Sequence, residues 1–259
     1  FKRSSYIMQA TYKNHMGTDL DVVNAARVSF NKKSKWKEYD GENSNEFMLE
    51  KRDTKLIYYL ARHKHLSPFG HCFASFHVKA PVFVSRQLVK HKFLRWNEIS
   101  RRYVDSEPEF YIPTYWRKKA EDKKQGSSGN MELTLFRTNC VNNISNSSKT
   151  TYREMIEDGV APEMARMILP QTLMTEWIWS GSLDAFAAMC NLRCTFDTQD
   201  ETRIIADTVS IILEGLFPVS WNALMSREVR ARQAIAELEK REKKQGELKK
   251  FWLDGKEIT

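Results

Sequence analysis

The most constraining feature of this sequence is a short stretch in which apolar and polar side chains alternate. At residues 72–79 the even positions are Cys, Ala, Phe and Val, and the odd positions are Phe, Ser, His and Lys. A period of two places one set on each face of a β-strand, so we predict a strand buried on one face. Pro81 suits the first position of a helix, which we expect to continue to about His91.

Helical patterns occupy much of the remaining chain. We predict amphipathic helices at 182–193 and 199–216, and a helix dense in both charge signs at about 227–250. The mixture predicts an α+β fold in which helices cover a mostly antiparallel sheet. We assign a single domain to residues 1–225 and a charged C-terminal helical extension to 226–259.

Residues 118–150 differ in composition from the rest of the domain. Several lysines precede the run Gly126-Ser127-Ser128-Gly129, and Asn and Ser dominate 139–148. This composition predicts an exposed insertion and is compatible with disorder, with helical patterns resuming near Tyr152.

Composition restricts the class of protein. The formal net charge of +8 favours an anionic partner, which could be nucleic acid, a membrane surface or a phosphorylated small molecule. No window approaches the roughly 18 apolar residues of a membrane helix, so we expect a cytoplasmic protein without membrane contact. The four cysteines contain no CxxC pair, which favours reduced thiols and no metal site.

The segment 86–103 is the strongest candidate for a functional site. Seven basic side chains fall within 17 positions and only Glu98 opposes them. Cations beside a buried strand need anions or water, and guanidinium groups suit phosphates. A solvated helix face is the alternative. Gln87, Asn97 and Ser100 favour a site, because neutral donors and acceptors orient small ligands.

This segment resembles the signature of flavin-dependent thymidylate synthases. The family carries Arg-His-Arg, seven residues and then Ser, usually followed by x-Arg-Tyr. This chain has Lys90-His91-Lys92, seven residues and then Ser100-Arg101-Arg102-Tyr103. Further similar motifs follow the family's order across residues 10–116 and 150–220: His65-x-Ser67-Pro68, Ala165-Arg166-x-x-Leu169-Pro170 and Asn191-Leu192-Arg193.

The resemblance implies an enzyme with the family's fold and assembly. It would be a homotetramer whose active sites are shared between subunits. Its cofactor would be FAD, reduced by NADPH. Methylenetetrahydrofolate would donate the carbon that converts dUMP to dTMP.

The resemblance also implies roles for individual residues. Arg193 would be catalytic, because a guanidinium beside N3 and O4 stabilises ionised uracil without a cysteine nucleophile. The expected nucleotide contacts are Gln87, Lys90, Glu98, Ser100, Arg102, Arg166 and Arg193. The expected flavin contacts are His65, Ser67, Lys90, His91, Lys92 and Glu98.

Departures from the family pattern leave alternatives open. Lysine replaces both signature arginines and lacks their planar fork. Four further positions differ on the flavin side: Ser182, Asp184, Ala188 and Asp197. These differences motivate dCMP as an alternative acceptor. A third hypothesis is a basic protein that binds single-stranded nucleic acid through Trp96 and its cationic neighbours. The enzyme hypothesis expects no nucleic-acid partner.

Overall fold

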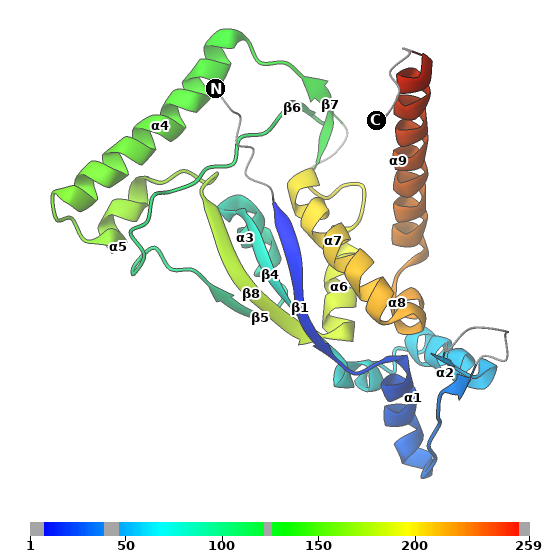
Figure 1. Cartoon of the computed structure of the whole chain (residues 1–259). Helices are drawn as coiled ribbons and strands as arrows, with labels where there is room; N and C mark the ends of the chain where they lie inside the picture. Colours follow the sequence, from blue (N-terminus) through cyan, green and yellow to red (C-terminus); the bar gives the residue numbers. More distant parts are fainter. Residues whose placement is uncertain (1–7, 39–46, 122–125, 254–259) are drawn as a thin grey trace.

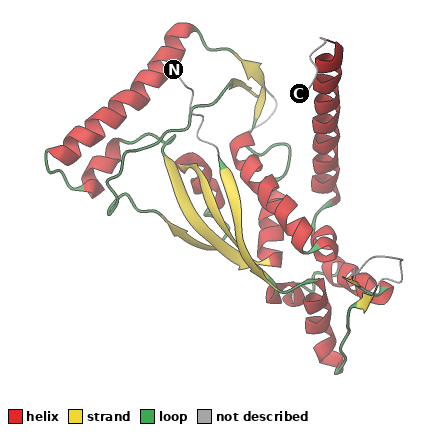
Figure 2. Ribbon diagram, in the orientation of Figure 1, coloured by secondary structure: helices red, strands yellow, loops and turns green. Residues whose placement is uncertain are grey.

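The computed structural model describes residues 8–38, 47–121 and 126–253. A four-stranded antiparallel sheet forms its centre, with the strand order β1-β4-β8-β5 (Figures 1 and 2). The strands are β1 (Gln9–Met16), β4 (Phe73–Pro81), β5 (Arg95–Glu98) and β8 (Met174–Ser182).

Helices account for most of the remaining elements. The helices are α1 (Asp19–Arg27), α2 (Lys51–Arg62), α3 (Val82–Leu88), α4 (Leu135–Glu157), α5 (Pro162–Ala165), α6 (Leu183–Arg193), α7 (Asp200–Leu216), α8 (Pro218–Leu224) and α9 (Arg227–Leu253). Three 3₁₀ turns are η1 (Val28–Phe30), η2 (Ser67–His71) and η3 (Arg166–Ile168). Two short strand pairs join β2 (Lys37–Glu38) to β3 (Phe47–Met48), and β6 (Trp116–Lys119) to β7 (Ser127–Met131).

The predicted strand is confirmed as β4. Its even-numbered side chains are buried, and Phe76 packs edge-on against Phe186 of α6 at a ring distance of 5.3 Å. The neighbouring strand β8 contributes Trp179, whose ring lies 5.4 Å from Phe186. Strand alternation thus builds a core between the sheet and α6, as expected for an α+β fold.

The other face of the sheet is polar. His77 and Lys79 point to Glu176 at 3.0 and 3.4 Å. On the same face, Ile178 of β8 retains 42% exposure. Within the described chain, helices therefore cover one face of the sheet rather than both.

The insertion is more ordered than its composition suggested. It contains the β6–β7 pair and most of α4, so the helix begins at Leu135 and not near Tyr152. The Thr134 hydroxyl accepts a hydrogen bond from the Arg137 amide at 3.3 Å, and Gly159 follows the helix with φ +84°. Asn and Ser cost only about 0.7 kcal/mol or less each in a helix, so caps and packing outweigh them. The segment is largely exposed, and residues 122–125 lie outside the described part.

The predicted charged helix is present as α9, which projects from the body of the molecule beside α7 and α8 (Figure 1). Its first turns are anchored, because Arg232 forms an ion pair with Asp207 of α7 and is only 5% exposed. No helix in the described ranges is both long and apolar enough to cross a membrane.

The fold closes through a carboxylate that joins distant parts of the chain. Asp19, 3% exposed, accepts hydrogen bonds from the backbone amides of Val219 and Ser220 at 2.9 Å each. It thereby caps the N-terminus of α8. The Asp19→Ala variant leaves these amides without acceptors, so we expect the free energy of unfolding to fall by about 1–3 kcal/mol in urea titrations.

Asp21→Ala is the matched control, because its exposed carboxylate contacts only the Thr18 hydroxyl among described side chains. We expect a change within about 0.5 kcal/mol for the control. Equal losses in the two variants would contradict a capping role for Asp19.

Candidate functional site

Two helices that leave opposite ends of paired strands bring the first group of predicted site residues together. β4 and β8 pair antiparallel from Phe73–Ser182 to Pro81–Met174. α3 follows β4 and α6 follows β8, so the helices return over the sheet from opposite ends. At about 1.5 Å per residue, α3 is about 10 Å long and α6 is about 16 Å long. The nine-residue strands that they run along are about 30 Å long, so the two helices together cover nearly the whole length of the strands. Their C-terminal ends therefore meet.

At this meeting point the side chain of Arg193 contacts the end of α3. Its Nε donates to Nε2 of His91 at 3.3 Å, and its Nη2 donates to the Gln87 carbonyl at 3.5 Å. The Gln87 side chain donates to Oε1 of Gln199 at 2.7 Å. We call Gln87, His91 and Arg193 the Arg193 group.

Burial sets the protonation state of this group. Burial, followed by the charge of Arg193, lowers the pKa of His91 to about 4. His91 is therefore neutral at pH 7 and accepts at Nε2, with its proton on Nδ1. Burial also lowers the pKa of Arg193, although the nearby Asp197 carboxylate opposes the shift. The guanidinium stays charged but poorly solvated, which strengthens its attraction for anions.

A cavity of about 750 Å³ opens beside this group, within the size range of small-ligand sites. Gln87, Arg193, Asp197 and Gln199 contribute to its wall. The remaining lining residues are Gly126, Leu192, Thr195, Phe196, Thr198 and Glu228.

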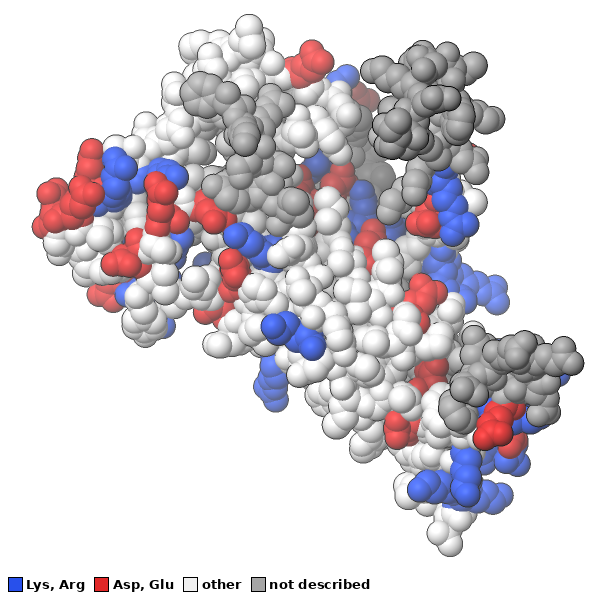
Figure 3. Space-filling view, viewed as in Figure 1, with Lys and Arg blue, Asp and Glu red and all other residues white. Residues whose placement is uncertain are grey.

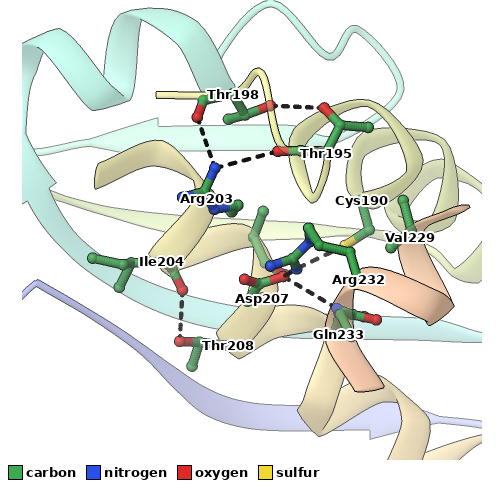
Figure 4. A network of polar contacts seen from close by, with 12 residues as sticks. Cys190, Thr195, Thr198, Arg203, Ile204, Asp207, Thr208, Val229, Arg232 and Gln233 are labelled. Carbon is green, nitrogen blue, oxygen red and sulfur yellow. Dashed lines mark hydrogen bonds and ion pairs between the residues drawn. The ribbon is translucent and has the colours of Figure 1, made fainter. Parts of the chain in front are cut away.

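The loop beside the cavity is held by one arginine of α7. Nη1 of Arg203 donates to the carbonyls of Thr195, Phe196 and Thr198 at 3.4, 3.2 and 3.1 Å. Figure 4 shows the contacts with Thr195 and Thr198. Nη2 of Arg203 pairs with Asp200 in the first turn of the same helix. The loop that follows Arg193 is thus fixed through its backbone.

A second set of predicted residues, Ser100, Arg102 and Arg166, lies on two segments that both contact α4. Ser100 Oγ accepts from the backbone N and the Nε of Arg102 at 3.3 Å each. We call these three residues the Arg102 group.

Helix α4 contacts both segments that carry this group. Arg101 lies 5.9 Å over the ring of the buried Tyr152, and Lys149 pairs with Glu107 at 3.0 Å. Ser148 donates to the carbonyl of Ile168, in the turn that begins with Arg166, at 2.9 Å. Within the described chain, no hydrogen bond or ion pair connects the Arg102 group to the Arg193 group.

Glu98 belongs to neither group and is held in the sheet. Its Oε1 accepts from Thr175 at 2.6 Å and its Oε2 accepts from Trp96 at 3.1 Å. Among the described residues Glu98 forms no ion pair with Arg102.

The predicted flavin contacts lie on two surface segments. Lys90 and Lys92 flank His91 in the turn after α3, which ends at Leu88 and not at His91 as expected. Both lysines are exposed and have no hydrogen-bond or ion-pair partner among described residues. His65 and Ser67 are exposed at the start of η2. Two unpaired ammonium groups with neutral donors suit a dinucleotide pyrophosphate, so this set fits FAD chemically.

Two of the departing positions also lie on α6. Asp184 has a buried Oδ1 without a hydrogen-bond partner, and a Cβ added to Gly70 of η2 would lie 3.9 Å from it. Ala188 is exposed.

Three of the four cysteines, Cys72, Cys190 and Cys194, are buried. All four are free, and none lines the cavity within the described ranges. Burial raises the pKa of Cys72 to about 12 and the pKa of Cys190 well above its usual range. Buried thiols of this kind are unreactive. The described residues also contain no cluster of three or more potential metal ligands.

Sequence reasoning missed several residues of this site: Gly126, Gln199, Arg203 and Glu228. Gln199 and Arg203 lie just after the Asn191-Leu192-Arg193 motif and could have been suspected from that proximity. Gly126 and Glu228 reach the cavity from segments distant in sequence, and no local pattern indicates this.

Comparisons with known proteins identify the family of the chain. Residues 12–219 match the family described as thymidylate synthase complementing protein. The chain is 38% identical over 214 residues to a flavin-dependent thymidylate synthase of Thermus thermophilus, covering 81% of this chain and 73% of that protein. It is 34% identical over 212 residues to the enzyme of the same description from Thermosipho africanus, covering 81% and 87%.

A solved structure is similar as well. The UMP/dUMP methylase PolB from Streptomyces cacaoi, bound with 5-Br dUMP, superposes with a TM-score of 0.70 and 26% identity. The match covers 84% of this chain and 94% of that one.

The neutral state of His91 predicts a pH dependence of stability. The unfolded histidine has a pKa of about 6.5, above the folded value of about 4. Between these values the unfolded state binds more protons, so the free energy of unfolding falls as the pH drops from 6.5 towards 4. We expect His91→Gln to weaken this pH dependence in urea titrations at pH 7.5 and 5.0. His71→Gln, at an exposed histidine, should not, and an unchanged slope in the His91 variant would refute the burial effect.

Proposed function

Because the chain belongs to the family of flavin-dependent thymidylate synthases, we propose that it methylates dUMP to dTMP with methylenetetrahydrofolate, FAD and NADPH. The observation that carries the proposal is the poorly solvated Arg193 guanidinium beside a cavity large enough for a nucleotide. The nucleotide-bound methylase of similar fold supports the same substrate class.

Arg193 would activate the substrate ring. Uracil C5 is a weak nucleophile until negative charge develops on the ring. A guanidinium beside N3 and O4 lowers the pKa of the N3 proton and favours the ionised ring. The attraction between the guanidinium and the ring anion is strong because burial limits the solvation of Arg193 by water. His91 accepts a hydrogen bond from Nε of Arg193 and, being neutral, adds no second positive charge. The C5 carbon can then attack the methylene group of the donor and subsequently lose its own proton.

This route needs no covalent bond between protein and substrate. The described cavity wall contains no cysteine, and burial keeps the Cys190 thiol protonated. A thiolate attack on C6 is therefore unsupported.

The flavin would lie near Lys90, His91 and Lys92, with His65, Ser67 and Glu98 completing its contacts. Lys90 and Lys92 are free to neutralise its phosphates as point charges. When bound, the flavin supplies the hydride that completes the methyl group, and NADPH would restore the hydride.

The separation of the two groups supports sites shared between subunits of a homotetramer. Around the cavity the described chain provides one cation, Arg193, and two carboxylates, Asp197 and Glu228. This wall alone is poorly suited to a phosphate. Arg102 and Arg166 are exposed elsewhere on the molecule, and supplied by a second subunit they would bind the phosphate.

The face of the molecule drawn in Figure 3 gives no support to the nucleic-acid hypothesis. On the face shown in Figure 3, basic and acidic side chains are interspersed and form no continuous basic stripe. Long single strands are bound along such stripes. The dCMP alternative is tested separately, by measuring product formation from dCMP beside dUMP.

The Arg193→Ala variant should lose dTMP formation. Removing the group that stabilises the ring anion should lower kcat/KM by about 10²–10³-fold or more. The assay measures dTMP from dUMP, with dCMP in parallel, and thermal unfolding checks the fold. Arg241→Ala, on the exposed surface of α9, is the matched control and should remain active. Near-normal turnover by the Arg193 variant would exclude its catalytic role.

A shared site also predicts complementation between inactive variants. Arg193→Ala and Arg102→Ala chains should each be inactive, since each lacks one half of every site. Co-expressed and assembled together, they should recover part of the activity, because some sites then combine an intact Arg193 with an intact Arg102. No recovery in isolated mixed oligomers would mean that both arginines act within one subunit's site or that one of them is not required.

A further inference from the structure

One part of the cavity wall comes from outside the region that matches the family. Glu228 lies in the first turn of α9 and lines the cavity with Arg193, whereas the family match ends at residue 219. The Glu228 carboxylate forms no hydrogen bond or ion pair with any residue of the described chain. Glu228 is exposed to solvent at the edge of the cavity, so its carboxylate is available to accept a hydrogen bond from a ligand there.

The backbone on either side of Glu228 is held in place, by hydrogen bonds before it and by a buried side chain after it. The side chain of Asn191 donates to the Leu224 carbonyl at 2.9 Å and accepts from the Ser226 amide at 2.7 Å. These bonds tie the start of α9 to the last turn of α6, two residues before Arg193. The next residue, Val229, is fully buried.

A second anchor follows one turn later on α9. Arg232 and Gln233 both bind the Asp207 carboxylate of α7, one turn along that helix from Arg203 (Figure 4). The first turn of α9 is therefore held against the two helices that border the cavity, and Glu228 is presented from a rigid backbone.

Charge determines which part of a nucleotide can face this wall. A carboxylate accepts hydrogen bonds and repels phosphate. Asp197 and Glu228 both contribute negative charge, so the phosphate should point away from them and towards the Arg102 group of another subunit. With the base at Arg193, the hydroxyl of the sugar is the donor that remains.

We propose that Glu228 is a specificity-determining residue that accepts a hydrogen bond from the free 3′-hydroxyl of the bound deoxynucleotide. The inference rests on the proposed function, since it takes dUMP as the ligand. It also explains how the site would select a mononucleotide, because a nucleotide within a strand has no free 3′-hydroxyl.

The test combines a change in the ligand with a change in the protein. Binding of dUMP and of 2′,3′-dideoxyuridine 5′-monophosphate to the FAD-loaded enzyme is measured by calorimetry. The native enzyme should bind the dideoxy analogue about 10-fold more weakly, the scale of one charge-assisted hydrogen bond in a partly solvated site. In Glu228→Ala the two ligands should bind within about twofold of each other, because the lost contact is the one that distinguished them.

The matched control is Glu237→Ala, which removes an exposed carboxylate of α9 outside the cavity and should keep the 10-fold preference. An equal loss of affinity for both ligands in Glu228→Ala, or a retained preference, would overturn the proposal. The native enzyme tests it independently of any variant, since equal binding of the two ligands would also overturn it. Absence of dUMP binding altogether would instead refute the proposed function.

Discussion

The antiparallel pairing of β4 with β8 is the constraint on which the site depends. The nine-residue register fixes where α3 and α6 begin, and the lengths of these two helices then decide where they end. A helix longer or shorter by one turn would move its end by about 5.4 Å and separate Arg193 from Gln87 and His91. The core contacts of Phe76 and Trp179 with Phe186 hold α6 at the correct distance from the sheet. The chemistry of the arginine is thus a consequence of strand register.

The two groups of polar residues differ in how they are supported. The Arg193 group is built on rigid elements and is partly buried, so its arginine is already desolvated before a ligand arrives. The Arg102 group lies on the surface, where α4 positions its two segments through Tyr152, Lys149 and Ser148. Such an arrangement suits a site that forms between subunits. One subunit would provide the group that acts on the base, and another would provide charges for the phosphate.

The sequence predicted much of this architecture, and its failures have physical causes. β4 and α7 were visible because burial imposes a period of 2 or 3.6 on the residues of each element. α9 was predicted from its mixed charges, and α6 was predicted as amphipathic although its residues are buried on nearly every side. The turn at His91 was not visible, because α3 stops at Leu88 where its end meets α6, a contact about a hundred residues away in sequence. The part of α4 before Tyr152 was missed because Asn and Ser are weak helix formers singly.

For the site, too, residues within local sequence motifs were predicted and residues brought in by distant parts of the chain were not. Motif resemblance identified Arg193, Gln87 and Ser100, whose neighbours in sequence carry the signal. It did not identify Glu228, which reaches the cavity through tertiary packing. The individual roles assigned by resemblance, and the domain boundary at residue 225, remain predictions.

The clamp formed by Arg203 has a consequence for how this protein could diverge. One guanidinium nitrogen recognises three main-chain oxygens, and main-chain oxygens are the same for every amino acid. The conformation of residues 195–198 is therefore largely independent of which side chains they carry. Natural variation can replace the side chains that border the ligand space while the loop keeps its course. This freedom allows related enzymes to change the size and polarity of what they admit without rebuilding the scaffold.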